Sequence, residues 1–165
     1  MSINDALLPE YDREMAQTRR LLERLPEDRL WWKPHDASRT LGALATHIAG
    51  LPRWAVAVFD TPVFDLDATG LQTPELASRQ AIVELFDRHA AAARAALAGR
   101  SDAEYLARWT LRQDGENVFT LPRAAVIRAM VLNHLVHHRG QLTVYLRMLG
   151  VPLLPLYGPT ADPMP

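Results

Sequence analysis

The sequence contains no cysteine. This absence excludes disulfide bonds, thiolate metal ligands and a cysteine nucleophile, so any metal ion has to be bound by nitrogen or oxygen atoms. A dominant charge is also missing, because 18 basic and 19 acidic residues give a formal net charge of −1. No overall charge attracts nucleic acid or an anionic membrane, and we expect neither as a partner.

Long apolar runs are missing as well. No uninterrupted run reaches the roughly 18 residues that a membrane span needs. The segment 1–17 has neither the basic nor the apolar region of a signal peptide. We therefore expect a soluble, cytoplasmic protein. Its 165 residues, 48% of them hydrophobic, suit one globular domain that covers residues 1–165.

Proline and glycine residues divide the chain into stretches of helical periodicity. Four long stretches have apolar residues at three- and four-residue spacing, over residues 4–24, 38–59, 74–99 and 120–150. Pro26 ends the first stretch, and Ser38 is a candidate N-cap of the second, which Pro52 should kink. Pro74 and Pro122 suit the first turns of the third and fourth helices.

Four amphipathic helices predict an all-α fold, a four-helix bundle in which residues 25–38 and 60–73 form long connections. Residues 108–111 and 117–120 flank Asp114 and Gly115, which predicts a small hairpin or an ordered loop. The tail 151–160 is too rich in proline for a helix and too apolar to be free in solvent. We expect it to pack along the bundle.

Three of the six histidines lie within residues 134–138. An advance of about 100° per residue places His134 and His138 in the middle of the apolar side of the fourth helix, about 40° apart, and His137 at its edge. On the second helix, His47 lies on the apolar side. Three inward imidazoles predict a site for one divalent cation, which would give each ring a partner.

An ordinary core position remains the alternative, because a single buried histidine is more often a core residue than a metal ligand. Three together make the metal site about as good an explanation as core packing. His89 also projects toward the apolar side of its helix, and we interpret it as a core residue or as a neighbour of the site. His137 either supports the site or is exposed, and His35 lies in a loop and should be solvated.

Several segments resemble the DinB/YfiT-like superfamily: TLGALATHIAGLPRW at 40–54, NHLVHHRGQLTVYLR at 133–147, GVPLLPLYGP at 150–159 and WWKP at 31–34. The resemblance covers nearly the whole chain. It implies an up-down-down-up four-helix bundle, often a homodimer, with one divalent metal ion held by three histidines. These correspond here to His47, His134 and His138. Characterised branches of the superfamily include transferases that join a low-molecular-weight thiol to an electrophile, and a thiol-dependent isomerase.

An enzyme is the first functional hypothesis. The metal ion, zinc or nickel before others, would activate a low-molecular-weight thiol or, less favourably, water for reaction with a small-molecule substrate. Sulfur would have to come from outside the chain. Trp54, Gln141 and Tyr145 project on the same faces as the ligands and are candidates for lining the pocket, although plain core packing is the commoner role. Arg139 is expected to project outward, and no inward carboxylate stands out as a general base.

A non-catalytic metal-binding protein of a stress or damage response is the second hypothesis. Its ion would stabilise the bundle, and structural zinc usually takes four protein ligands. Only three convincing ligands are found, although His89 could complete the set. Direct DNA binding has no support in the charge balance or in any clustered basic stripe.

Overall fold

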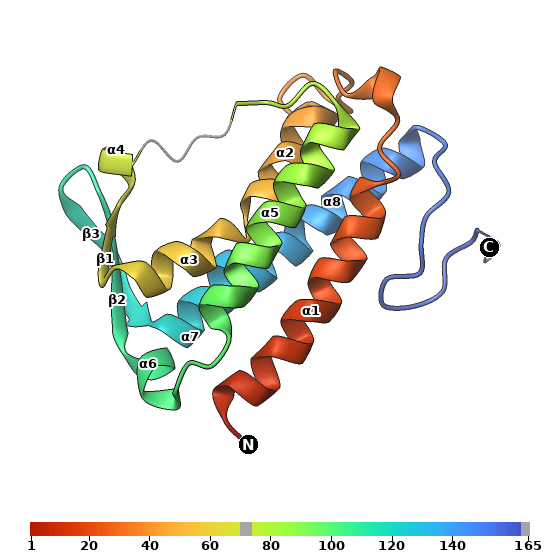
Figure 1. Cartoon of the computed structure of the whole chain (residues 1–165). Helices are drawn as coiled ribbons and strands as arrows, with labels where there is room; N and C mark the ends of the chain where they lie inside the picture. The colour runs from red at the N-terminus through yellow and green to blue at the C-terminus, as the bar shows by residue number, and fades with distance from the viewer. Residues whose placement is uncertain (70–73, 163–165) are drawn as a thin grey trace.

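Helices make up most of the structure, a computed structural model that describes residues 1–69 and 74–162 (Figure 1). The longer helices are α1 (Ile3–Leu22), α2 (Leu41–Gly50), α3 (Arg53–Asp60), α5 (Arg79–Leu97) and α8 (His134–Met148). The shorter ones are η1 (Glu27–Arg29), α4 (Leu66–Thr69), α6 (Asp102–Leu106), α7 (Arg123–Val126) and a π-helical segment, η2 (Ile127–Asn133). Helix therefore forms within each of the four stretches of helical periodicity.

Short polar side chains determine where two of these helices begin. The Thr40 hydroxyl accepts a backbone N–H from the first turn of α2, and the Ser78 hydroxyl does the same for α5. The predictions of Ser38 as an N-cap and of Pro74 in a first helical turn are therefore wrong. Both helices begin later than predicted, directly after the side chains whose oxygens accept the free N–H groups of the first turn.

Pro52 separates α2 from α3, as the sequence predicts. Proline has no N–H to continue the helical ladder, and the Leu51 N–H bonds instead to the Ile48 carbonyl at 3.2 Å. The window Leu41–Asp60 is long and apolar enough to cross a membrane, with a mean hydropathy of 1.2, but 67% of it is buried inside the protein. Core helices of globular proteins share this property, so the window is weak support for a membrane span.

A small sheet corrects the prediction of an all-α fold. Its strands β1 (Val63–Asp65), β2 (Arg108–Gln113) and β3 (Glu116–Pro122) lie in the order β1-β2-β3. Strands β2 and β3 form the predicted hairpin around Asp114 and Gly115, which both have positive φ. Strand β1 pairs with β2 in parallel. The predicted connection 60–73 thus contains β1 and α4, while its residues 70–73 lie outside the described part.

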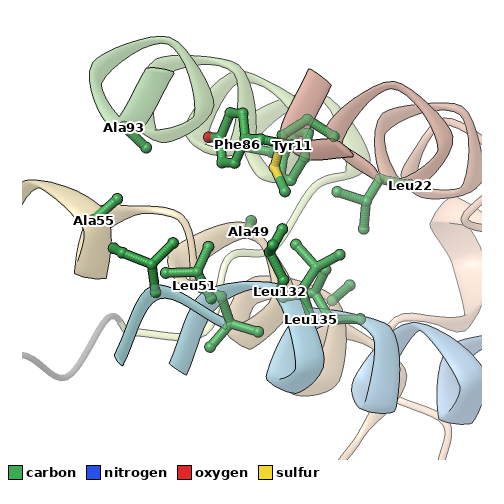
Figure 2. Close-up of a cluster of buried hydrophobic side chains, with 14 of the residues drawn as sticks. Tyr11, Leu22, Ala49, Leu51, Ala55, Phe86, Ala93, Leu132 and Leu135 are labelled. Atoms are coloured by element: carbon green, nitrogen blue, oxygen red, sulfur yellow. The ribbon is translucent and has the colours of Figure 1, made fainter. Parts of the chain in front are cut away.

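The hydrophobic core lies between the long helices. Helix α5 contacts α1, α2 and α3, and α8 contacts both α2 and α1. Figure 2 shows Tyr11 and Phe86 facing Leu132 and Leu135 across this core, and all four side chains are at most 2% exposed. The Tyr11 hydroxyl donates a hydrogen bond to the Ala90 carbonyl at 2.9 Å, so its one polar atom is satisfied inside the core.

The C-terminal tail packs against the helices, as predicted. Leu154 is 7% exposed, and Gln17 of α1 donates a hydrogen bond to the Leu156 carbonyl at 3.0 Å. The Asp162 carboxylate accepts the Leu153 N–H at 2.8 Å and pairs with Arg147 of α8. The tail is therefore tied to both α1 and α8.

Candidate metal centre

His47, His134 and His138 meet between α2 and α8, with all three side chains half-buried. Their candidate ligand atoms all lie within 4.8 Å of one another. The Nε2 atom of His134 is 3.3 Å from Nε2 of His47 and 2.9 Å from Nε2 of His138. The structure thus brings together the three histidines that the helix faces select. Below, we call these three residues the histidine group.

The far sides of two rings are held by oxygen acceptors. His138 Nδ1 lies 2.7 Å from Gln141 Oε1, and because this oxygen can only accept, the ring donates the proton. His134 has a hydrogen bond to the backbone of Met130, which is part of the π-helical segment η2. In both rings these bonds place the proton on the nitrogen that faces away from the centre of the group. The Nε2 lone pairs of both rings then face the centre of the group.

Burial keeps the histidine group uncharged. It is the largest cause that lowers the pKa of His47 to about 4, and the charges of His138 and Arg39 lower this pKa further. Burial likewise lowers the pKa values of His134 and His138. At neutral pH two Nε2 lone pairs therefore lie at hydrogen-bond distance with no proton between them. A divalent cation relieves this repulsion, so the three residues fit a metal ion.

The three candidate lining residues have different positions. Trp54 lies on the wall of the cavity beside the histidine group. Gln141 holds the His138 ring. Tyr145 packs edge-on against Trp32, with ring centroids 5.8 Å apart, and donates its hydroxyl hydrogen to the Arg39 carbonyl at 3.2 Å. Of the three, only Trp54 is placed to touch a molecule in the cavity, whereas the other two position neighbouring residues.

The remaining histidines stay outside the group. His89 Nδ1 donates to the Ala49 carbonyl at 3.0 Å, so this ring satisfies a carbonyl near the end of α2. His137 is exposed and touches the His138 ring, with centroids 4.8 Å apart. His35 is exposed in its loop, as expected. Within the described residues, no fourth histidine, aspartate or glutamate belongs to the group.

A cavity of about 890 Å³ opens beside the histidine group and includes His47 and His134 in its wall. The helix faces do not predict several charged and polar residues of its lining, which are Arg39, Arg53, Asp67, Glu75 and Gln113. They come from loops and from the ends of short elements, where no periodicity marks a side chain as facing inward. The two carboxylates of this wall are exposed and do not belong to the histidine group.

Arg139 does not project outward, contrary to the prediction from its helix face. Its side chain is 1% exposed and forms an ion pair with Glu14 of α1 at 2.5 Å. It also donates to the Thr18 hydroxyl and to the hydroxyl of Tyr157 in the tail. The prediction failed because α8 is covered on two sides, by α2 and by α1, so that a polar face can also be buried.

Comparisons with known proteins identify the family and the fold. A sequence model of the DinB family matches residues 1–164. The fold is similar to the crystal structure of a DinB-like protein from Bacillus cereus, at 24% identity and a TM-score of 0.70, covering 94% of this chain and 98% of that one. It is also similar to a DinB-like protein from Bacillus subtilis, YjoA, at 18% identity and a TM-score of 0.71, covering 93% and 97%. No curated protein gives a significant match.

Proposed function

The chain belongs to the DinB family, and we propose that it binds one divalent metal ion through His47, His134 and His138. One observation carries this proposal: the Nε2 atoms of His134 and His138 lie 2.9 Å apart while their outer nitrogens are held by other partners. Neutral imidazole nitrogens are good ligands for zinc and nickel, which are the ions that we propose first.

We propose further that the protein is an enzyme of the thiol-transferase type. Three protein ligands leave coordination positions open, and a cavity large enough for a small molecule begins at two of the three rings. A divalent ion supplies Lewis acidity, which lowers the pKa of a thiol or of a water molecule. Trp54 contributes an apolar surface to the cavity wall, and Gln141 keeps the His138 ring oriented.

Hydrolysis is less favoured because no carboxylate of the described residues belongs to the histidine group. The two carboxylates of the cavity wall accept hydrogen bonds elsewhere, Glu75 from the Thr40 hydroxyl at 2.6 Å and Asp67 from the Asp114 N–H at 2.5 Å. A general base has to lie within hydrogen-bond reach of the proton that it takes. The family resemblance and the composition also support an up-down-down-up helix order, a homodimer and a cytoplasmic location, and we include these three properties in the proposal.

Metal analysis tests the binding site. Protein purified without a histidine tag and loaded with zinc should contain one ion per chain, whereas the His47→Ala/His138→Ala variant should contain almost none. The matched control is His35→Ala/His137→Ala, which removes two exposed histidines and should keep the ion. Equal metal content in the two double variants would contradict the site.

Turnover tests the enzyme against its alternative, a protein with a purely structural ion. The metal-loaded protein should accelerate the reaction of a low-molecular-weight thiol with a generic electrophile, and removal of the ion should abolish this acceleration. The structural alternative predicts that no thiol reacts faster and that removal of the ion lowers the melting temperature. The absence of a fourth ligand among the described residues favours the enzyme.

A further inference from the structure

The cavity beside the histidine group has apolar and charged surfaces. Leu51, Trp54 and Met130 contribute apolar side chains to its wall, while Arg39 and Arg53 contribute positive charges. Binding sites for small molecules commonly combine a mostly apolar surface with a few polar groups that fix the orientation of the ligand. The charged groups of this wall therefore indicate what kind of substrate the cavity takes.

Arg39 lies in the wall of the cavity together with His47 and His134. It directly precedes Thr40, the N-cap of α2, and its carbonyl accepts the Tyr145 hydroxyl of α8, so its backbone is held to both helices. The Arg39 side chain is therefore held at the same cavity that two of the three histidine rings line.

The guanidinium of Arg39 lines this wall without a counter-charge. It makes no ion pair or side-chain hydrogen bond with any residue in the described ranges 1–69 and 74–162. The two carboxylates of the wall form no ion pair within these ranges either, but each accepts a hydrogen bond, Glu75 from the Thr40 hydroxyl and Asp67 from the Asp114 N–H. An anion that enters the cavity can therefore pair with the Arg39 guanidinium in the wall that His47 and His134 share.

We propose that the substrate of this site carries a carboxylate, and that Arg39 binds this carboxylate while the reacting atom of the substrate faces the histidine group. Guanidinium and carboxylate pair through two parallel hydrogen bonds, which fix direction as well as distance. Such an anchor converts loose binding in a large cavity into a defined orientation at the metal ligands. This inference rests on the proposed function of the same site.

Thiols that differ only in one charged end test the inference. The probes are mercaptopropionate, mercaptobutyrate and mercaptohexanoate, each compared with the mercapto alcohol of equal length. Cobalt(II)-loaded protein reports thiol binding through the sulfur-to-cobalt absorption band. The wild-type protein should bind at least one acid about tenfold more tightly than its alcohol, the usual range for a charge-assisted hydrogen bond.

The Arg39→Gln variant should lose this preference and bind the acid and the alcohol equally, within about twofold. The acid and the alcohol have different thiol pKa values, which affect their binding to the metal ion. This effect is the same in both proteins, so it cancels when the acid-to-alcohol ratio of affinities is compared between the wild-type protein and the variant. Arg20→Gln removes an exposed arginine of α1 away from the cavity and should keep the preference. Cobalt content and melting temperature of Arg39→Gln should match those of the wild-type protein.

Three outcomes would overturn the inference, and a fourth concerns the proposed function alone. Equal binding of acid and alcohol by the wild-type protein contradicts an anionic substrate. A preference that survives in Arg39→Gln contradicts the role of this residue. A cobalt-loaded protein that binds none of the thiols contradicts both the inference and the thiol chemistry. A protein that holds no cobalt contradicts the metal site itself and is recognised separately by metal analysis.

Discussion

Arg139 and Glu14 form a buried ion pair that links α8 to α1, next in sequence to the histidine group. Their side chains are 1% and 4% exposed, and the nitrogen and oxygen atoms lie 2.5 Å apart. The Tyr157 hydroxyl donates to the same carboxylate oxygen at 2.5 Å, and the Arg139 guanidinium lies over the Tyr157 ring. Because His138 precedes Arg139 in the chain, this pair fixes the rotation of α8 that turns the His138 ring toward α2.

Glu14→Gln should destabilise the protein by about 3 kcal/mol, because it leaves the Arg139 charge buried without its counter-charge. For a chain of this length, the melting temperature should fall by about 10 °C. The measurement is urea denaturation followed by circular dichroism. Replacement of both partners, in Glu14→Gln/Arg139→Met, removes the unpaired charge and should recover part of the loss.

The matched control is Arg13→Gln. Arg13 pairs with the other oxygen of Glu14 at 3.4 Å, but its side chain is 62% exposed. An exposed pair contributes little, so this variant should change the free energy of unfolding by less than about 0.5 kcal/mol. Similar losses in Arg13→Gln and Glu14→Gln would mean that burial does not govern the strength of these interactions.

Acid should weaken the protein through Glu14. Burial raises the pKa of this carboxyl, but hydrogen bonds from Tyr157 and Arg139 outweigh it and hold the pKa below the usual value of 4.5. A lowered pKa in the folded state means that the stabilisation is complete above about pH 4.5 and is lost as the pH falls through the folded pKa. The free energy of unfolding should therefore decline less steeply between about pH 5 and pH 3 in Glu14→Gln/Arg139→Met than in the wild-type protein. Parallel curves for the two proteins would contradict this assignment.

Gln141→Leu should weaken metal binding about tenfold without abolishing it, because the His138 ring loses the acceptor that fixes its orientation and its proton. The affinity is measured by competition with a chromophoric chelator. His137→Gln is the control, since His137 touches the His138 ring but is exposed and bonded to no ligand. Equal affinities of the Gln141→Leu variant and the wild-type protein would show that the ring is held by packing alone.

The histidine group could be predicted from the sequence because its geometry is local. His134 and His138 are one helical turn apart, and their common direction follows from the helix alone. The direction of His47 follows from the apolar residues around it on α2. The one long-range feature of the group is the packing of α2 against α8. The apolar face of each helix carries histidine, and burying the two faces against each other brings the histidines together.

Arg139 and Arg39 could not be placed in the same way. The side of α8 that carries Arg139 is polar, so the sequence predicts that it is exposed. It is buried because Glu14 of α1, which is distant in the sequence, supplies a counter-charge. Arg39 lies in a connection without periodicity. Likewise, the parallel pairing of β1 with β2 joins Val63 to Thr110, and three residues of strand leave no recognisable pattern. These features depend on long-range contacts that a face analysis does not contain.

His89→Ala should destabilise the protein by about 1–2 kcal/mol and leave metal binding unchanged. The His89 ring donates to the Ala49 carbonyl, and burial lowers its pKa, so the neutral ring with its proton on Nδ1 is the form that makes this bond. Its loss leaves the carbonyl near the end of α2 without a donor, which accounts for the expected cost. If His89 instead completed a structural metal site, the variant would bind zinc far more weakly. Chelator competition distinguishes unchanged from weakened zinc binding, and it is measured on the folded protein at a temperature well below the melting point. A variant of unchanged stability and lowered zinc affinity would therefore favour the structural ion over the open site.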